Sequence, residues 1–368
     1  MALVWVLVLL LYGLYRINLF FLNYLKLASV FLHTVPNMND QSGGKKNCFY
    51  NIPGEHETQM SEGGEAELHK CLVLCKKNPG HTQFVPVESF SIEHLPRSHR
   101  DEHLYEVIKY VADLTVRIDV KMTSPGRPEF WPDTKVPYPF YQVRGSEMLR
   151  LGSGRVYEVT KCTDVVGGDG EAVGDRACCC HRCQSSDSPS KVWWNVEVLT
   201  AAHVVFDKLE AGNTSCRLFY DTKDSPLYIL DMVKIEEVSL DRDWCKLNCV
   251  TCDTEIIDKL IRTRTHLNDN WRCVYDKFKT SRDEDRLAFM VSHPHGCPKQ
   301  ISIGQWIKKH QFEDDFNKFT YTTCTCPGSS GATVHCVGYS GRWSRGYQLV
   351  HSGTSDSDNN FSGVGRVW

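Results

Sequence analysis

One short stretch of this chain has the form of a loop that presents a nucleophilic serine. The core of segment 324–332 reads Gly-x-Ser-Gly-Ala, with Ser330 as its serine. A serine hydroxyl is a weak nucleophile near neutral pH, so it needs a base to take its proton and donors to hold the oxyanion that forms. Gly328 lets the backbone curl so that its own N–H and that of Ser330 can converge on one point. Pro327, which has no N–H, lies outside that pair.

Two upstream stretches supply the partners that such a serine needs. An alternating apolar strand runs into the tetrapeptide Thr-Ala-Ala-His, which ends at His203. Further along, Asp243 directly precedes a mostly apolar stretch, Trp-Cys-Lys-Leu. Gly/Ser-rich turns alone are common in loops, so the serine motif gains its weight from these two stretches. The chemistry they indicate is acyl transfer, with the residues in the order His, Asp, Ser.

This order and the Thr-Ala-Ala-His motif resemble the chymotrypsin-like (PA clan) serine proteases, whereas α/β-hydrolases and subtilisins use other orders. The resemblance covers roughly residues 145–368. It implies that His203 is the general base, that Asp243 orients it, and that Ser330 attacks the substrate carbonyl. It also implies an oxyanion hole made by the N–H groups of Gly328 and Ser330.

Each catalytic assignment has an alternative in the sequence. His203 could be a buried core histidine, Asp241 competes with Asp243, and Ser329 competes with Ser330. Asp243 is preferred because the family's aspartate directly precedes a strand of the form apolar-small-x-apolar. Ser330 is preferred because it alone precedes the Gly-Ala pair.

A flanking stretch, residues 289–304, resembles the Gly-x-Pro-x-Gly hairpin of HtrA-type members of the clan. It contains His293 and His295, which permit a metal-binding interpretation. The favoured interpretation places both histidines in a loop between two strands.

The expected specificity pocket differs from that of trypsin. Cys324, six residues before the serine, stands where trypsins carry the aspartate that attracts Lys or Arg. Thr325 and His351 match a Thr/His pair of glutamyl endopeptidases and of picornaviral chymotrypsin-like cysteine proteases, which cut after Glu or Gln. A hydroxyl and an imidazole N–H can both donate to a carboxylate or amide oxygen. Ser352 and Gly353 are expected to form the edge along which a substrate backbone pairs.

The activation machinery of digestive trypsins is absent from the sequence. No Arg-Ile-Val-Gly-Gly stretch precedes the first expected barrel, and Ser329 occupies the position where trypsins carry an aspartate. We therefore expect that the site does not depend on the cleavage that activates trypsin zymogens.

The resemblance implies that these residues are positioned by an all-β fold of two packed six-stranded antiparallel barrels. An N-terminal apolar helix and a small helical or linker region are expected in addition. At 368 residues and 42.0 kDa, the chain has room for one such domain of roughly 220 residues and an N-terminal region. The net charge of −3 is not the basic charge that is typical of nucleic-acid-binding proteins. The expected divisions are 1–30 as a membrane anchor or signal segment, 31–100 as a polar linker, 101–145 as a helix and Pro-rich lead-in, and 146–368 as the protease domain with barrels at about 146–255 and 256–368.

Within the lead-in, two patterns predict regular structure. Apolar residues at helical spacing predict a helix over 101–112 that packs against the protease domain, and residues 114–120 alternate like an edge strand.

The N-terminal residues 2–15 are apolar or glycine, and Arg16 follows them. Fourteen residues fall short of the roughly 20 that span a bilayer, although a second apolar run can extend them. The alternatives are a single-pass membrane anchor, a signal segment cleaved on secretion, and an interfacial helix or a misassigned start. The side of the membrane stays open.

Seventeen cysteines form an odd and high count. In the insertion 160–191, a zinc knuckle and hairpin disulfides are alternatives, and the weak zinc candidates are Cys162, Cys180, His181 and Cys183. The pair Cys71 and Cys75 reads as a local staple. The group Cys245, Cys249 and Cys252 reads as core or disulfide residues. Asn213 and Asn360 begin glycosylation sequons.

The sequence thus predicts a serine endopeptidase that acts through an acyl-enzyme at Ser330, with no cofactor. Its expected partners are protein or peptide substrates and, through the N-terminal segment, a membrane. The alternative is a catalytically silent protease-like binding module. The complete set of His203, Asp243 and Ser330 favours the enzyme, because a silent relative has no chemical need to keep all three.

Overall fold

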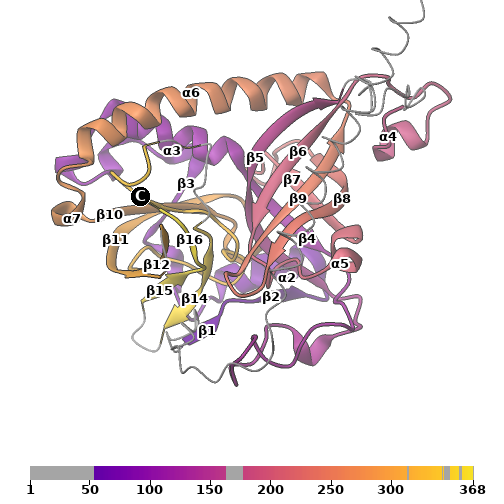
Figure 1. Cartoon of the computed structure of the whole chain (residues 1–368), viewed down its shortest axis with the longest axis horizontal. Coiled ribbons are helices and arrows are strands. Elements are labelled where there is room, and N and C mark those ends of the chain that lie inside the picture. The colour runs from indigo at the N-terminus through magenta and orange to yellow at the C-terminus, as the bar shows by residue number, and fades with distance from the viewer. Residues whose placement is uncertain are drawn as a thin grey trace, which may run out of the picture. The chain divides into compact units, whose positions relative to one another are not determined.

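The computed structural model describes residues 54–162, 177–312, 315–341, 343, 349–355 and 359–367. The expected N-terminal anchor at 1–30 lies outside these residues. Among the helices that are described, none combines the length and apolarity needed to cross a membrane. The described part is mostly β-structure, with a closed six-stranded antiparallel barrel, a second sheet and two long helices (Figure 1).

The barrel closes because its first and last strands pair with each other. The order around it is β5-β4-β7-β8-β9-β6, and β6 pairs back onto β5. Inward-facing residues of β6 and β9 alternate with outward-facing ones, as the two-residue period of a strand requires. The strands of this barrel are β4 (Thr115–Val120), β5 (Leu149–Cys162), β6 (Trp193–Thr200), β7 (Thr214–Leu218), β8 (Tyr228–Ser239) and β9 (Trp244–Thr251).

The second sheet follows the order β1-β14-β15-β12-β11-β10-β13, with β16 on β12 and β3 on β11. An isolated antiparallel bridge joins Thr333, just before β13, to Val350, just before β14. The expected second six-stranded barrel is therefore a nine-stranded sheet. Its strands are β1 (Gly54–His56), β3 (Phe84–Pro86), β10 (Leu287–Ser292), β11 (Gln300–Gln311), β12 (Phe316–Tyr321), β13 (Val334–Cys336), β14 (His351–Ser355), β15 (Asn360–Ser362) and β16 (Gly365–Arg366).

Two helices pack together over the sheets (Figure 1). The carboxylate of Asp101 accepts from the Leu104 N–H at the start of α3 (Glu102–Leu114), and Asp253 caps α6 (Thr254–Phe278) in the same way. The expected packing of a helix near 101–112 is confirmed. The sequence analysis did not predict α6. The shorter helices are α2 (Gly64–Val73), α4 (His181–Gln184), α5 (Lys208–Gly212) and α7 (Arg282–Asp285), and 3₁₀ turns include η1 (Pro79–His81) and η6 (Pro294–Gly296).

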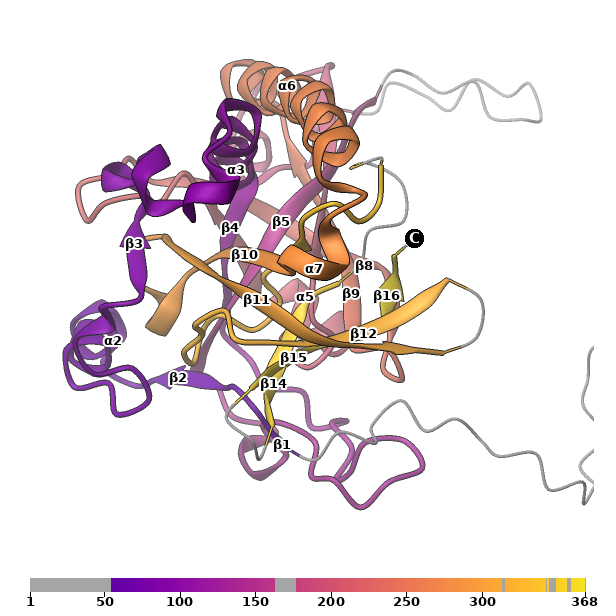
Figure 2. The same ribbon diagram turned by 90° about the vertical axis from the view of Figure 1, so that its left-hand side faces the viewer.

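The stretch expected to be a linker is built into both sheets from Gly54 onward. Its strand β1 pairs with β14, β2 (Gln59–Ser61) pairs with β5, and β3 pairs with β11. Figure 2 shows β1, β2, α2 and β3 along one side of the two sheets. The strand expected at an edge, β4, lies instead between β5 and β7, because both of its edges are paired.

Candidate active site

Ser330 lies in the loop between β12 and β13, and strand β5 fixes this loop by hydrogen bonds. The N–H of Ser153 donates to the Ser330 carbonyl at 2.8 Å, and the Ser153 hydroxyl donates to the Gly328 carbonyl at 2.8 Å. Gly331 has a φ of +86°, and a Cβ there would lie 2.2 Å from the Thr200 hydroxyl. Only glycine fits that conformation and that space. The loop that carries the serine is thus fixed against the barrel.

His203 and Asp243 meet in the interior, His203 just after β6 and Asp243 just before β9. The imidazole Nδ1 lies 2.8 Å from Asp243 Oδ2, and the His203 backbone N–H donates to Oδ1 at 3.0 Å. The Ser352 hydroxyl also donates to Oδ2. Burial alone would raise the pKa of Asp243, but His203 and the hydrogen bonds outweigh it and lower that pKa. The carboxylate is therefore ionised and holds the imidazole with Nε2 free to face a substrate.

The Pro-rich lead-in supports the histidine from behind. Arg127 donates to the His203 carbonyl at 3.0 Å and forms a fully buried ion pair with Glu210. The Tyr138 hydroxyl donates to the Ala202 carbonyl at 3.3 Å. The sequence analysis gave these residues no role, because their contacts lie about 60–85 positions away along the chain.

The Ser330 hydroxyl does not point at the histidine in this structure. It donates instead to the backbone carbonyl of Glu57 at 2.6 Å. His203 Nε2 is buried and makes no hydrogen bond to any residue that the structure describes. Catalytic hydrogen bonds are often long or unformed in the free enzyme and commonly tighten only in the reacting complex.

A piece of the chain itself runs through the site in the manner of a bound peptide. Strand β1 pairs antiparallel with β14, with His56 opposite Gly353, so the expected substrate edge is occupied. A Cβ on Gly353 would lie 2.2 Å from the Glu55 carbonyl, so this approach requires glycine. Beyond Glu57, strand β2 pairs with β5 of the barrel. The segment therefore crosses from one sheet to the other past Ser330.

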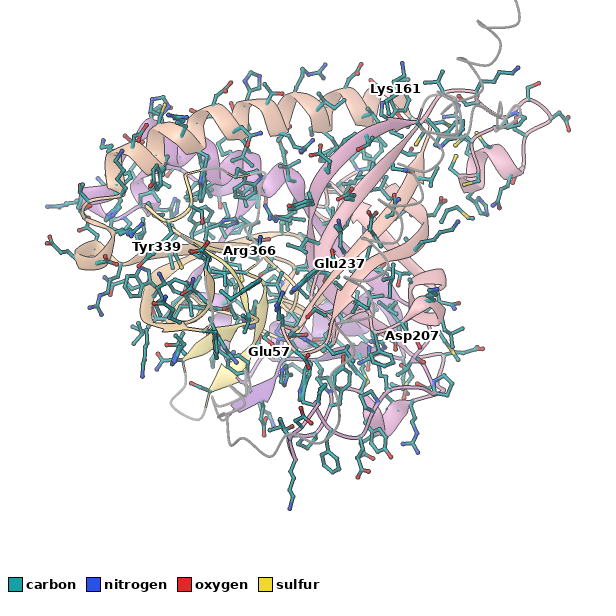
Figure 3. All side chains as sticks on the ribbon, viewed as in Figure 1. Glu57, Lys161, Asp207, Glu237, Tyr339 and Arg366 are labelled. Carbon is teal, nitrogen blue, oxygen red and sulfur yellow. The ribbon has the colours of Figure 1, made fainter. Side chains whose placement is uncertain are left out.

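The side chain of Glu57 fills the expected specificity pocket. Its carboxylate lies 2.9 Å from His351 Nε2, 3.0 Å from the Thr325 hydroxyl and 3.1 Å from the Thr354 hydroxyl. It also forms an ion pair with Lys77. Figure 3 labels Glu57 in the region where the barrel and the second sheet meet.

The walls of this pocket are held by further hydrogen bonds. The Tyr321 hydroxyl lies 2.7 Å from His351 Nδ1, which leaves the Nε2–H of the imidazole to donate to the carboxylate. The Asn360 amide donates to the Thr323 carbonyl at 2.7 Å, and its oxygen lies 2.8 Å from the Thr325 hydroxyl. Asn360, which the sequence marks only as a sequon, is therefore a buried part of the pocket wall.

Charge in the pocket favours an anion. Burial alone would raise the pKa of Glu57, but His351 and the Lys77 ammonium outweigh it and lower the pKa from 4.5 to about 2. Lys77 follows α2, in the stretch expected to be a linker, and its side chain remains 32% exposed. Cys324 lies nearby, but its thiol contacts Asn78 and Gln83 rather than the carboxylate.

An aromatic cover closes the site over the histidine. The His56 ring lies 5.2 Å from the His203 ring and 4.7 Å from the Trp131 ring. His203 is fully buried beneath them. The residue that precedes Glu57 thus packs on the His203 imidazole, and water is excluded from the His203–Asp243 pair.

The cysteine-rich insertion forms a thiol cluster different from the expected zinc set. The sulfurs of Cys178, Cys180, Cys183 and Cys252 lie within 4.8 Å of one another. Cys180 and Cys183 were expected there, but the other two expected ligands are replaced. His181 is exposed and Cys162 lies outside the cluster, because β9 brings Cys252 into their place. Four thiols at this spacing match a structural zinc site.

Disulfides do not form among the described residues, where all sixteen cysteines are free. The staple expected between Cys71 and Cys75 is wrong, because the Cys75 sulfur lies 3.6 Å from that of Cys326.

Comparison with known proteins gives neither a family nor a curated relative: no family model and no curated protein matches the chain. Solved structures similar to it are serine proteases. The active form of the Rv3671c protease from M. tuberculosis shares 12% identity and a TM-score of 0.35, with 72% of this chain and 82% of that one covered. The HtrA-type protease AlgW with a tripeptide shares 11% identity and a TM-score of 0.35, with 72% and 60% covered.

The resemblance to PA clan serine proteases thus has counterparts among solved structures. Their TM-scores lie below 0.5, so these structures carry no argument for an activity of this chain.

Proposed function

We propose that the chain is a serine endopeptidase that cuts peptide bonds after glutamate. In this reaction Ser330 Oγ adds to the carbonyl carbon while His203 Nε2 takes its proton, and Asp243 stabilises the imidazolium. The N–H groups of Gly328 and Ser330 hold the oxyanion. The amine leaves with the proton from His203, and water then hydrolyses the acyl-enzyme.

The observation that carries this proposal is the placement of Glu57. Its carbonyl oxygen accepts from Ser330 Oγ at 2.6 Å, while its carboxylate lies in the pocket of His351 and Thr325. A C=O bond is about 1.23 Å long, so the carbonyl carbon lies within reach of the nucleophile. This arrangement of side chain and carbonyl is what cleavage after glutamate requires, and it therefore supports the proposal.

The pocket supports glutamate over glutamine. Every group around the carboxylate donates or carries positive charge: Lys77, the His351 Nε2–H, and the hydroxyls of Thr325 and Thr354. A carboxylate accepts from all of them. A glutamine amide would turn an NH₂ group toward donors and would leave Lys77 without its counter-charge, which disfavours it.

Labelling with a fluorophosphonate tests the proposal. Because the chain's own segment occupies the site, the labelled protein carries Glu57→Lys, which replaces the docked carboxylate with a cation beside Lys77 and opens the pocket. We expect labelling and hydrolysis of glutamyl peptides by this chain, and loss of both when Ser330→Ala is added. A folded Glu57→Lys chain that neither labels nor hydrolyses such peptides would assign the pocket to binding without cleavage.

A further inference from the structure

We propose that the bond between Glu57 and Thr58 is itself a substrate, which the chain cuts within one molecule. This inference rests on the proposed function. It begins with the direction of the segment: residues 54–56 pair with β14 before the bond, and residues 59–61 pair with β5 after it. Both sides of the bond are therefore held as strands, which is how proteases hold extended peptides.

Position along the strand is fixed as well as direction. His56 lies opposite Gly353, and Glu57 follows with its side chain in the pocket and its carbonyl at Ser330. A shift by one residue would turn the neighbouring side chain toward the pocket, because strand side chains alternate between faces. Glu55 is exposed and does not enter the pocket. The structure therefore selects one bond.

The reaction requires no external reagent except water. Ser330 Oγ bonds to the Glu57 carbonyl carbon, the bond to the Thr58 nitrogen breaks, and His203 delivers the proton to the new Thr58 amine. Water then releases the Glu57 carboxylate. Lys77 remains on the 58–368 side, so the pocket keeps its cation after the cut. Among the described residues of the 1–57 product, 54–56 pair with β14, the His56 ring packs on His203 and Trp131, and the Glu57 side chain lies in the pocket. Departure of this product would open the site to other substrates.

The test is the N-terminus of the purified full chain. We expect fragments 1–57 and 58–368 by intact mass, with Thr58 as the new first residue. Ser330→Ala and Glu57→Lys chains should stay intact, whereas Glu55→Lys, a matched change two residues away on the exposed side, should be cut. A first-order rate that is unchanged over a hundredfold dilution would establish cutting within one molecule.

The outcomes separate this inference from the proposed function. If the Glu57→Lys chain hydrolyses glutamyl peptides while the wild type keeps its 57–58 bond, self-cleavage is refuted and the function stands. If no chain hydrolyses any peptide, both fail. A rate that rises in proportion to concentration would assign the cut to a second copy and overturn cleavage within one molecule.

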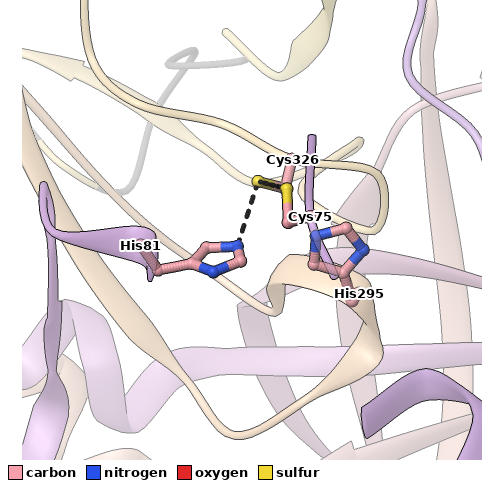
Figure 4. Close-up of side chains that lie close together, drawn as sticks. All are labelled: Cys75, His81, His295 and Cys326. Atoms are coloured by element: carbon pink, nitrogen blue, oxygen red, sulfur yellow. Dashed lines mark hydrogen bonds between the residues drawn. The ribbon is translucent and has the colours of Figure 1, made fainter. Parts of the chain in front are cut away.

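A second, independent observation is a cluster of four metal-type ligands beside the nucleophile loop (Figure 4). It joins Cys75 and His81 of the N-terminal segment to His295 of η6 and Cys326 of the loop, with all donor atoms within 4.8 Å of one another. The Cys75 and Cys326 sulfurs are 3.6 Å apart, and the Cys326 sulfur lies 3.4 Å from His81 Nε2.

These distances fit a metal better than a disulfide. A zinc ion with tetrahedral Cys₂His₂ ligands holds its sulfurs about 3.8 Å apart and a sulfur and a nitrogen about 3.5 Å apart. A disulfide would need about 2.05 Å between the sulfurs. Both cysteines are free.

The surroundings of the cluster also match a metal site. The Asn78 backbone N–H donates to the Cys75 sulfur at 3.4 Å and the Asn78 amide donates to the Cys326 sulfur at 3.1 Å, as thiolate ligands require. His295 Nδ1 lies 3.0 Å from the Gln59 side-chain oxygen, which directs Nε2 away from Gln59. That Nε2 is buried and has no hydrogen-bond partner among the described residues.

From this geometry we infer a structural zinc site at Cys75, His81, His295 and Cys326. Cys326 lies between Thr325 of the pocket and Pro327, whose carbonyl accepts from the His295 backbone N–H at 2.6 Å. An ion here would fasten the N-terminal segment, which carries Lys77, to the loop that carries Ser330. The pocket would then stay assembled after the segment 1–57 leaves.

Zinc content of the full-length Ser330→Ala chain tests this site without reference to activity. The double variant Cys75→Ser, His81→Ala should bind about one zinc ion fewer per chain than its parent, while Cys71→Ser, a neighbouring control, should not change the content. Equal zinc content in folded parent and double variant, or a Cys75–Cys326 disulfide by mass spectrometry, would overturn the proposal.

A further variant covers the case in which the double variant does not fold. Cys252→Ser removes the separate four-thiol cluster and leaves this one intact. X-ray absorption of that chain should show zinc with two sulfur and two nitrogen ligands. A folded Cys252→Ser chain without zinc would refute the site.

Discussion

Two regions meet at Ser330, and they differ in how they take part. The loops of the two sheets bring His203, Asp243 and Ser330, which are set by backbone turns and fixed by hydrogen bonds within the protease fold. Residues 54–81 come from outside those loops, yet they bring the glutamate in the pocket and the lysine that faces it. In the function we propose, the loops supply the reacting groups and the segment indicates which substrate the site would accept.

The largest expected effect is a loss of activity when one of the loop residues, Asp243, is changed. Asp243→Asn keeps the hydrogen-bonding shape but lets the imidazole take the wrong tautomer, so kcat for a glutamyl peptide should fall by about 10⁴-fold. Asp241→Asn is the matched control and should leave kcat unchanged. Equal losses in both variants would contradict the assignment of Asp243.

A smaller effect concerns the edge on which the segment pairs. Gly353→Ala would place a Cβ 2.2 Å from the Glu55 carbonyl, and overpacking of this kind costs about 1–3 kcal/mol. In a Ser330→Ala chain, hydrogen exchange of residues 54–56 should therefore speed up about tenfold or more. Gly212→Ala, where a Cβ meets nothing within 4 Å, should have no such effect. Unchanged exchange in the Gly353 variant would contradict the pairing.

The charge that the segment contributes can be isolated through Lys77. Lys77→Met removes the only cation that contacts the carboxylate among the described residues, so the ratio of kcat/KM for Glu over Gln peptides should fall about tenfold. Partial exposure of the lysine keeps the effect from being larger. The chain's own docked segment competes equally with both peptides, so its effect on kcat/KM cancels in this ratio. Lys76→Met, one residue away, should leave the ratio unchanged, and a similar fall there would point to a general field effect.

The smallest effect is a dependence of stability on pH. The pKa of docked Glu57 lies below its ordinary value of 4.5, so its stabilising contribution is complete above about pH 4.5 and is lost as the pH falls toward 2. In the Ser330→Ala background, the Glu57 chain should have a higher Tm than the Glu57→Gln chain at pH 6. The difference should shrink as the pH is lowered through 4. A constant difference would show that the carboxylate charge does not hold the segment.

The triad residues could be selected from sequence because each belongs to a short local pattern. His203 follows a strand and two alanines, Asp243 directly precedes a strand, and Ser330 precedes a glycine that its tight turn requires. The Thr325 and His351 pair could likewise be chosen by position, and the structure brings both to one carboxylate.

The residues that segment 54–81 brings to the site could not be predicted in this way. Residues 54–81 are polar and glycine-containing, which is the composition of a linker. The contacts that place Glu57, Lys77 and Cys75 at the site are made with residues more than 200 positions away. Lys77 carries no local pattern that sets it apart from Lys76. The sequence permits a metal-binding interpretation of His295, but the cysteines that lie beside it come from two distant segments.

Elements defined by a local sequence pattern could be predicted, whereas the neighbours that distant strands provide could not. The hairpin of β10 and β11 is confirmed, because its alternation and turn are local. The edge assignment of β4 failed, since two further strands cover it, and α6 was not predicted although its apolar residues recur at helical spacing. The sequence predicts a site that does not depend on the cleavage that activates trypsin zymogens. The segment that occupies the site favours the opposite, because cutting it would open the pocket to other substrates.

The most direct test of the account is the preference for the residue before the cut, measured with a peptide library on the Glu57→Lys chain. The account predicts that glutamate is preferred over every other residue, with glutamine far behind, and that Ser330→Ala abolishes all cleavage. A preference for Lys, Arg or an aromatic residue before the cut would contradict the glutamate pocket on which the account depends.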